Sequence, residues 1–275
     1  MKTLYITDLD GTLLNSEGVI SDKTKEIINR LSKEGLLFSV ATSRSVLSAI
    51  PLLDGVNITA PVVAMSGVAV YDTANKKTVN YYSIDEKSYY RLIEIFEKHG
   101  KAPFSFFFNK NNEEYEIIFT DLKLDEHKKY YDIRKNSLGV NIHRVEKYDI
   151  PENASPVFTS ICDRYEDLIK ITSEIDKMPE LSYSFYKDTY TAYWFLDVFN
   201  AKASKADGLR IVKEYTGADE AVAFGDNNND LPLFAAADRK YAVKNAVEEL
   251  KAKADGIIAS NDEDAVAEFV KKDFK

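Results

Sequence analysis

The segment Asp8-Leu9-Asp10-Gly11-Thr12, directly after the apolar run Leu4 to Thr7, carries the strongest signal in this chain. The run predicts a buried strand, and ligands of open α/β sheets bind outside the carboxyl ends of the strands. Both carboxylates are therefore expected at a ligand site. Asp10-Gly11 alone indicates only a turn. A calcium loop is excluded, because the sixth and twelfth positions from Asp8 are Leu13 and Val19, where an EF-hand needs Gly and Glu.

Strand and helix patterns alternate outward from this segment. In the first third a helix is expected from Ser21, with Gly35 as its C′ stop, followed by strands at Leu36 to Thr42 and Pro61 to Met65 with a helix from Ser45 to Leu53 between them. The last third repeats the pattern, with helices from Ser204, Asp230, Ala246 and Asp262 and strands at Ala221 to Phe224, Lys240 to Val243 and Gly256 to Ile258. This alternation predicts an α/β fold whose Rossmann-like core has a parallel sheet covered on both faces.

The middle of the chain has a different pattern. After an expected hairpin, Val68 to Ser83, come the aromatic-rich strand candidates Phe104 to Phe108, Tyr115 to Phe119, Val157 to Ile161, Leu181 to Tyr186 and Tyr190 to Leu196. They predict an antiparallel sheet with helices Glu86 to His99 and Tyr165 to Met178 on one face. We expect residues 1–82 and 197–275 to form the core and residues 83–196 to form an inserted α+β cap domain. The aromatic side chains are expected to form the core of its sheet rather than a ligand cage.

A second polar segment, Gly225-Asp226-Asn227-Asn228-Asn229-Asp230, follows the expected strand Ala221 to Phe224. Leu231 and Ala237 at its sixth and twelfth positions exclude an EF-hand again. A turn that caps the next helix explains this segment alone. Two carboxylate clusters at the ends of two parallel strands, however, repel each other unless a cation lies among them. Oxygen ligands at such a place favour Mg²⁺ that also touches a substrate phosphate.

The composition of the chain argues against two classes of partner, nucleic acids and membranes. The 275 residues carry a net charge of −9, which argues against a broad nucleic-acid surface. No segment approaches the roughly 20 apolar residues of a membrane span, and the amino terminus lacks a signal-peptide pattern, so we expect a cytoplasmic protein without membrane partners. Cys162 is the single cysteine and lies in an apolar run, which is typical of a core thiol. His99, His127 and His143 lack the spacing of a zinc helix.

The ordered set of polar segments resembles a known family. Asp8-Leu9-Asp10-Gly11-Thr12, Thr42, Lys205 and Gly225-Asp226…Asn229-Asp230 are similar to the four motifs of the haloacid dehalogenase (HAD) superfamily. The insert before the lysine resembles the α/β cap of the Cof-like phosphatases in that superfamily. The resemblance covers essentially the whole chain, including Ala242-Val243-Lys244-Asn245-Ala246 and Asn261-Asp262-Glu263-Asp264 near its end.

The resemblance implies a Mg²⁺-dependent phosphatase of small phosphorylated metabolites, with sugar phosphates as the leading class and an aspartyl-phosphate intermediate. Asp8 would be the nucleophile, and Asp10 would protonate the leaving oxygen and then activate water. Asp8, the backbone carbonyl of Asp10 and Asp226 would hold Mg²⁺, with Asp230 in support. A metal ion and a cation fit this chemistry, because an anionic nucleophile must approach a dianionic phosphate.

The resemblance also implies the phosphate-binding residues. Thr42 and Ser43 would contact the phosphoryl group, Lys205 would offset its charge and that of Asp8, and Asn229 would position Lys205 or the substrate. The chain departs from the usual pattern of the subgroup at three places. Ser43 stands where Gly is usual, Ser66 where Asn is common and Ala265 where Gly is usual. These departures bear on specificity rather than on reaction type. Arg44 matches the local pattern but receives no role from the sequence.

Several alternatives stay open at this stage. A phosphosugar mutase uses the same aspartyl phosphate but returns the group to a sugar. A non-catalytic metabolite-binding protein or a signalling receiver keeps the fold type, although a receiver is shorter and has adjacent acids after its first strand. A dehalogenase is disfavoured, because that chemistry needs neither Asp10 nor a metal site. In this family sugar phosphates, nucleotides, flavin mononucleotide and pyridoxal phosphate are all substrate classes. Cap motion with linkers near Ser83 and Asp197 is a further hypothesis, and the oligomeric state is open.

Overall fold

In the computed structural model the chain, described for residues 1–137, 140–187 and 192–275, divides into two compact units. The core unit comprises Met1–Asn80 and Ser204–Lys275, and the cap unit comprises Tyr81–Ala203. Each unit has its own sheets and its own hydrophobic core. The predicted fold class, α/β with a parallel-sheet core and an inserted α+β region, is confirmed. The predicted limits of the two domains, at residues 83 and 196, stay a prediction.

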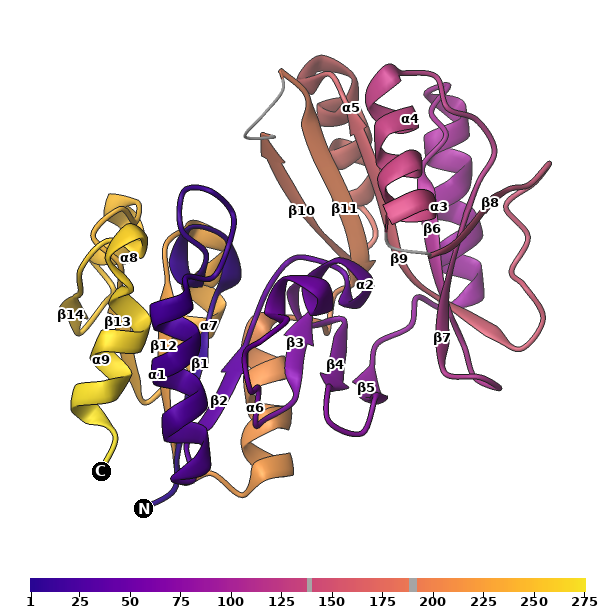
Figure 1. The fold of residues 1–275 in the computed structure, drawn as a ribbon. Coiled ribbons are helices and arrows are strands. Elements are labelled where there is room, and N and C mark those ends of the chain that lie inside the picture. Colours follow the sequence, from indigo (N-terminus) through magenta and orange to yellow (C-terminus); the bar gives the residue numbers. More distant parts are fainter. Residues whose placement is uncertain (138–139, 188–191) are drawn as a thin grey trace. The chain divides into compact units, whose positions relative to one another are not determined.

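The core unit is built on a five-stranded parallel sheet in the order β14-β13-β12-β1-β2 (Figure 1). Its strands are β1 (Thr3–Thr7), β2 (Leu37–Val40), β12 (Glu220–Gly225), β13 (Arg239–Ala242) and β14 (Gly256–Ile257). The first strand of the chain therefore lies between β2 and β12, and its pairing with β12 runs from Thr3↔Glu220 to Thr7↔Phe224. This register brings the chain segments that follow β1 and β12 to the same edge of the sheet.

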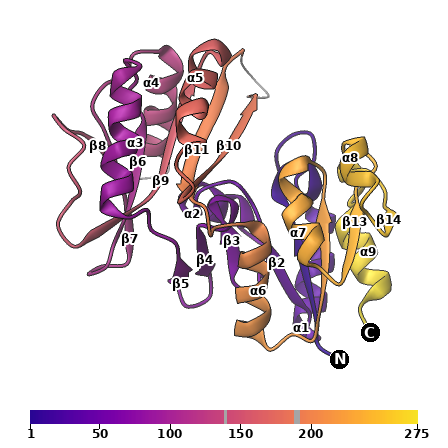
Figure 2. The same ribbon diagram turned by 180° about the vertical axis from the view of Figure 1, so that it is seen from behind.

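Helices cover both faces of this sheet (Figures 1 and 2). On one face α1 (Asp22–Lys33) and α9 (Ala265–Asp273) pack against a core that includes Tyr5, Phe38 and Phe224. On the other face α6 (Lys205–Thr216), α7 (Leu231–Ala236) and α8 (Glu248–Lys251) pack against a core that includes Leu4, Ile6 and Ala223. Since successive residues of β1 are buried on opposite faces, the middle of the strand, Leu4 to Ile6, is continuously apolar, as expected for a parallel sheet.

The predicted starts of two helices are confirmed by their caps. Ser21 accepts a hydrogen bond from the backbone N–H of Thr24 at the start of α1, and Ser204 accepts one from Asp207 at the start of α6, each at 3.0 Å. A cap of this kind satisfies a backbone donor that the first turn of a helix leaves unpaired. The cap at Ser204 fixes Lys205 as the first residue of α6.

The strand expected at Pro61 to Met65 is confirmed as β3 (Val62–Ala64), but its main partner differs from the expected one. β3 pairs antiparallel with β4 (Ala69–Asp72) in a separate sheet of order β3-β4-β5, with β5 (Lys77–Tyr81). Toward the parallel sheet it forms the isolated parallel bridge Ala41↔Val63, just after β2, and the Val63 carbonyl accepts from the N–H of Thr42 at 2.9 Å. The predicted hairpin is confirmed, and it is this hairpin that competes for β3. The helix expected from Ser45 is α2 (Val46–Ala49), which tightens into a 3₁₀ turn, Ile50–Leu53, because Pro51 offers no backbone donor.

The cap unit contains a six-stranded sheet in the order β10-β11-β9-β6-β7-β8. Its strands are β6 (Phe104–Asn109), β7 (Glu114–Phe119), β8 (Asn141–Arg144), β9 (Ala154–Asp163), β10 (Leu181–Lys187) and β11 (Trp194–Asn200). All neighbours are antiparallel except β7 and β8. Helices α3 (Glu86–Lys98) and α5 (Tyr165–Ile175) share one buried core with this sheet, as predicted. Phe104, Phe106, Phe107 and Phe108 are all buried, which agrees with their predicted role as sheet core.

Three features of the cap unit differ from the prediction. The last strand runs from Trp194 to Asn200 instead of ending at Leu196, so Asp197 is a buried strand residue and not a linker. Tyr190, the expected start of that strand, lies outside the described residues. Strand β8 and helix α4 (Asp125–Asp132) were not predicted. The sequence of α4 is strongly polar, and it packs through Tyr130, which stacks on Phe104 with ring centroids 4.4 Å apart.

Among the helices of the three described ranges, none has the length and apolar character needed to cross a membrane.

Candidate active site

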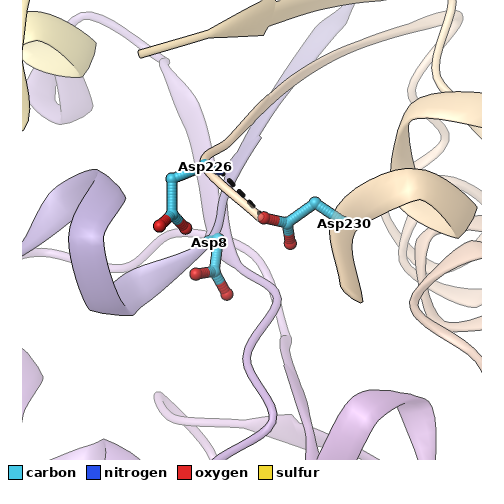
Figure 3. A group of neighbouring side chains, drawn as sticks. All are labelled: Asp8, Asp226 and Asp230. Atoms are coloured by element: carbon cyan, nitrogen blue, oxygen red, sulfur yellow. Dashed lines mark hydrogen bonds between the residues drawn. The ribbon is translucent and has the colours of Figure 1, made fainter. Parts of the chain in front are cut away.

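Three aspartates meet at the edge of the core sheet where β1 and β12 end. Asp8 follows β1, and its backbone N–H donates to the carbonyl of Phe224 in β12 at 2.9 Å. Asp226 follows β12, and Asp230 lies in the short turn Asn228–Asp230 before α7. One carboxylate oxygen from each of the three lies within 4.8 Å of the others (Figure 3). The two clusters predicted from separate parts of the sequence are thus one cluster in space.

Lys205 supplies the positive charge in this cluster. Its Nζ lies 2.5 Å from Oδ1 of Asp8 and 2.6 Å from Oδ1 of Asp230. The side chain is 1 % exposed, so its ammonium group is removed from water and depends on these two carboxylates. The Ser204 cap places Lys205 in the first turn of α6. From there its side chain reaches the carboxylates at the strand ends.

Asp230 is held by the protein on both of its oxygens. Oδ1 accepts from Lys205, while Oδ2 accepts from the backbone N–H groups of Asp226 and Asn227 at 3.0 and 3.2 Å. The dashed line in Figure 3 marks the bond between Asp226 and Asp230. Gly225 makes this approach possible, because a Cβ atom there would lie 2.7 Å from Oδ2 of Asp230. Asp230 therefore shapes the loop that carries Asp226 and orients Lys205.

Gly11 is required by two features of the turn that follows Asp8. Its φ of +72° belongs to the left-handed region, and a Cβ atom at this position would lie 2.5 Å from Oδ2 of Asp226. The same turn contributes Thr12, whose hydroxyl donates to Oδ1 of Asp226 at 3.1 Å. Asn245 donates to the carbonyl of Gly11 at 2.8 Å. The Asp8 to Thr12 segment is thus shaped to receive the carboxylate of Asp226.

The charges of the cluster are not balanced within the protein. Burial raises the pKa of Asp8 well above its usual range, the carboxylate of Asp230 adds to this, and Lys205 opposes it. Burial and the neighbouring Asp230 raise the pKa of Asp226 to about 6. Burial disfavours the ammonium form of Lys205, but Asp230 and Asp8 outweigh burial and raise its pKa. One ammonium group thus faces three carboxylates, and a further cation would relieve the remaining repulsion.

The donor set fits a hard divalent cation. Carboxylate and carbonyl oxygens are the ligands that Mg²⁺ and Ca²⁺ prefer, and no cysteine or histidine belongs to the described cluster. Asp8 and Asp226 are the side chains suited to hold such an ion. Asp230 is less suited as a direct ligand, because its two oxygens already accept three hydrogen bonds.

Thr42 lies beside this cluster, at the end of β2. The backbone N–H of Ala41 donates to the carbonyl of Thr7 at 2.8 Å, so the residues that follow β1 and β2 are neighbours. Thr42 is buried, and its Oγ1 accepts from the backbone N–H of Arg44 at 3.1 Å. Since the hydroxyl oxygen acts as acceptor there, its hydrogen can be donated to a ligand. Ser43, next to it, is half-buried.

The loop after β3 supports Thr42 from the other side. The backbone N–H of Ser66 donates to the carbonyl of Thr42 at 3.0 Å, and Met65 donates to the carbonyl of Arg44 at 2.8 Å. Ser66 has φ +55°, a left-handed conformation that Asn adopts more readily than Ser. The left-handed conformation would suit the Asn that the family resemblance leads one to expect there, and the hydrogen bonds of the loop hold Ser66 in it.

Asp10 and Asn229 differ from the rest of the predicted site. The side chain of Asp10 is 50 % exposed and forms an ion pair with Arg44. Asn229 is exposed, and it is Asp230 that contacts the ammonium group of Lys205. The sequence motifs assign no role to Arg44. Its position two residues after Thr42 is the signal that could have pointed to a role in the site.

Comparisons with known proteins agree with this architecture. The sequence profile of the haloacid dehalogenase-like hydrolases matches residues 5–270. A protein of Bacillus subtilis (strain 168) named 5-amino-6-(5-phospho-D-ribitylamino)uracil phosphatase YwtE is 29 % identical over 98 % of this chain and 97 % of its own length. A putative phosphatase of Haemophilus influenzae is 26 % identical over 100 % of this chain and 99 % of its own length.

A solved structure has the same fold over the full length. The crystal structure of a haloacid dehalogenase-like hydrolase from Bacteroides thetaiotaomicron superposes with a TM-score of 0.80 at 23 % identity and covers 100 % of both chains.

The fold and the strand-end cluster define an α/β protein with a buried acidic cluster at the carboxyl ends of its parallel strands. The chain belongs to the haloacid dehalogenase-like hydrolases, since their profile matches nearly its whole length. The family predicted from the sequence motifs is therefore confirmed, and so is the enzyme class, a phosphatase.

Proposed function

We propose that this phosphatase hydrolyses small phosphorylated metabolites in a Mg²⁺-dependent reaction, with sugar phosphates as the leading substrate class and Asp8 as the nucleophile. The observation that carries the proposal is the buried cluster in which Lys205 lies 2.5 Å from Asp8, with Asp226 and Asp230 around it. A nucleophilic carboxylate needs such a setting, because it must meet a phosphoryl group that is itself negatively charged. A cytoplasmic location, expected from the sequence, belongs to the same proposal.

Asp8, the backbone carbonyl of Asp10 and Asp226 would hold the Mg²⁺, with Asp230 supporting the loop of Asp226. When bound, the ion neutralises negative charge on the phosphoryl oxygens and on the carboxylates around it. Side chains of the core unit orient Asp8 and bind the phosphoryl group. Lys205 holds Asp8 in place and offsets its charge, and the Thr42 hydroxyl donates a hydrogen bond to a phosphoryl oxygen. Ser43 lines the same loop, and exposed Asn229 is left for contact with the substrate.

The reaction has two steps. In the first, a carboxylate oxygen of Asp8 forms a bond to phosphorus while the bond from phosphorus to the leaving oxygen breaks, and the carboxyl group of Asp10 protonates that oxygen. In the second, Asp10 takes a proton from water, whose oxygen forms a bond to phosphorus while the bond from phosphorus to the Asp8 oxygen breaks. Inorganic phosphate leaves, Asp8 is again a carboxylate, and Asp10 again carries the proton that it gives in the first step.

The substrate class is proposed from the family resemblance and from one similar phosphatase. The similar phosphatase from Bacillus subtilis is named for a phosphorylated ribityl group attached to a uracil ring. This compound contains a phosphorylated sugar alcohol, so it is consistent with the leading class and belongs in any substrate panel together with hexose and pentose phosphates, nucleotides, flavin mononucleotide and pyridoxal phosphate.

The experiment is phosphate release from this panel with and without Mg²⁺, for the wild type and for Asp8→Asn. Asp22→Asn, an exposed aspartate in the first turn of α1, is the matched control for the change of side chain. We expect metal-dependent turnover by the wild type and by Asp22→Asn and none by Asp8→Asn. Turnover that survives Asp8→Asn would contradict the nucleophile, and transfer of phosphate to a sugar instead of water would make the chain a mutase.

A further inference from the structure

Arg44 binds Asp10 with both arms of its guanidinium group. Nε lies 2.7 Å from Oδ2 of Asp10, and the second nitrogen, Nη2, lies 2.7 Å from Oδ1. The side chains are 38 % and 50 % exposed, so charge attraction alone would contribute little in water. A parallel pair of hydrogen bonds is different, because it fixes the carboxylate in one orientation.

The backbone of Arg44 is anchored beside the phosphate-binding threonine. Its N–H donates to Oγ1 of Thr42 at 3.1 Å, and its carbonyl accepts from the N–H of Met65 at 2.8 Å. Thr42 itself follows β2, which lies next to β1. The guanidinium group of Arg44 thus bridges two loops of the site, the one after β1 and the one after β2.

The paired hydrogen bonds to Arg44 do not suit the catalytic role that is proposed for Asp10. In the proposed reaction a carboxyl oxygen of Asp10 must face the leaving oxygen of the substrate. In the structure each oxygen of Asp10 instead accepts a hydrogen bond from Arg44. We expect the carboxyl group to leave the guanidinium group before it acts, which opens that group to an anion of the substrate. Phosphate is the natural replacement, since its oxygens match a guanidinium fork as well as those of a carboxylate.

We propose that Arg44 binds the phosphoryl group of the substrate in exchange for Asp10. Before the substrate binds, Arg44 holds Asp10 as a carboxylate. When the substrate binds, a phosphoryl oxygen takes the place of Asp10 at the guanidinium group. The released carboxylate takes up a proton from solvent and turns toward the leaving oxygen, to which it then gives that proton. Arg44 is thus a phosphate-binding residue that also positions Asp10, and the inference rests on the proposed role of Asp10 in the reaction.

The test is a double-mutant cycle on the binding of inorganic phosphate, measured by calorimetry at saturating Mg²⁺. The proteins are the wild type, Asp10→Asn, Arg44→Ala and the double variant. If Asp10 competes for the fork, Asp10→Asn binds phosphate about tenfold more tightly than the wild type, a typical coupling between two sites. In the Arg44→Ala background the same change at Asp10 has little effect. Arg44→Ala alone weakens phosphate binding.

Three controls separate this result from simpler causes. Arg30→Ala removes one positive charge from an exposed position on α1 and should leave phosphate binding unchanged. Arg44→Lys keeps the charge but not the fork, so it should not restore the coupling to Asp10. Thermal unfolding should be the same for all variants, because both side chains are partly exposed.

An equal gain from Asp10→Asn with and without Arg44 would show that only net charge matters and would overturn the exchange. Phosphate binding that is unaffected by Arg44→Ala would overturn it as well. Because the readout is equilibrium binding, it does not depend on turnover. A positive cycle with an inactive enzyme would count against the proposed reaction alone, and an active enzyme with a flat cycle would count against the exchange alone.

Discussion

Both units of the molecule bury an aspartate in a polar cluster, but they compensate its charge in different ways. In the core unit Asp8 and Asp230 share the ammonium group of Lys205, at 2.5 and 2.6 Å. In the cap unit Asp197 accepts hydrogen bonds from the hydroxyl groups of Ser160 and Tyr186, at 2.6 and 3.0 Å. The first arrangement keeps charge inside the protein, whereas the second is equally compatible with a neutral carboxylic acid.

The difference shows how burial alone fails to identify a functional carboxylate. Asp197 is 5 % exposed and Asp8 4 %, so the two cannot be told apart by accessibility. They differ in what faces them. Asp8 faces the carboxylates of Asp226 and Asp230 and the ammonium group of Lys205, whereas Asp197 faces the hydroxyl groups of Ser160 and Tyr186, with Arg134 as a nearby charge. A cluster that holds unbalanced charge requires an outside ion, and a cluster of hydroxyl groups does not.

The largest effect is expected when the cation is removed from the core cluster. Lys205→Met leaves the carboxylates of Asp8 and Asp230 buried without their partner. Removing one member of a buried ion pair typically costs about 3–5 kcal/mol, and we expect a loss of this size in metal-free urea unfolding. Lys213→Met is the control on the same helix, since Lys213 forms a more exposed pair with Asp238 at 2.8 Å and should cost at most about 1 kcal/mol. Equal losses of stability in Lys205→Met and Lys213→Met would show that the buried and the more exposed lysine stabilise the fold to the same degree.

The next effect comes from the cap cluster and depends on pH. Burial raises the pKa of Asp197 to about 6, against the opposing hydrogen bonds of Ser160 and Tyr186 and the charge of Arg134. The folded protein therefore binds a proton between about pH 4 and 6 that the unfolded chain has lost, so stability falls as pH rises through this range. One pKa unit corresponds to about 1.4 kcal/mol, which makes the total on the order of 3 kcal/mol.

Asp197→Asn should flatten this part of the stability profile, because the amide cannot ionise. Urea unfolding of the wild type and of this variant between pH 4 and pH 7 measures the difference. Asp22→Asn, exposed on α1, should keep the wild-type slope. A wild-type slope that persists in Asp197→Asn would mean that another group causes it.

The third prediction concerns Mg²⁺ and separates the two clusters by ligand. An ion that binds only the folded core should raise stability by about 2.7 kcal/mol at 100 times its dissociation constant. Calorimetric unfolding with and without Mg²⁺ measures this increase. Asp226→Asn should lose most of it, since Asp226 lies in the carboxylate cluster, and Asp197→Asn should keep it. An increase that survives Asp226→Asn would place the ion elsewhere.

Much of the core site could be predicted from the sequence, for a physical reason. Asp8 and Asp226 directly follow apolar strands, and parallel strands end at one edge of a sheet, so their proximity follows from the fold class. Lys205 was placed by its position in the order of motifs. Its buried contact with two carboxylates could not be derived, because it depends on the exact start of α6 at the Ser204 cap.

The rest could not be predicted because it depends on competition between contacts. β3 has the apolar pattern of a parallel strand, yet the neighbouring hairpin offers it an antiparallel partner. α4 lacks a clear apolar stripe and is held through Tyr130 on Phe104. The fork between Arg44 and Asp10 joins two exposed side chains from different loops, and no local pattern encodes such a pair.

The smallest expected effect has the opposite sign to that of Asp197. Asp72, at the end of β4, is buried, which alone would raise its pKa, but hydrogen bonds from Asn75, Tyr215 and Ala74 outweigh burial and lower the pKa to about 2. Its stabilising contribution is therefore present above about pH 4 and lost as the pH falls toward 2. Tyr215→Phe removes a hydroxyl that donates to Oδ2 of Asp72 at 2.7 Å. It should lower the stability measured by urea unfolding at pH 7, and progressively less below pH 4. A cost independent of pH would show that the tyrosine stabilises through packing. The low pKa of Asp72, and with it the opposite pH dependence of Asp72 and Asp197, would then come from the hydrogen bonds of Asn75 and Ala74.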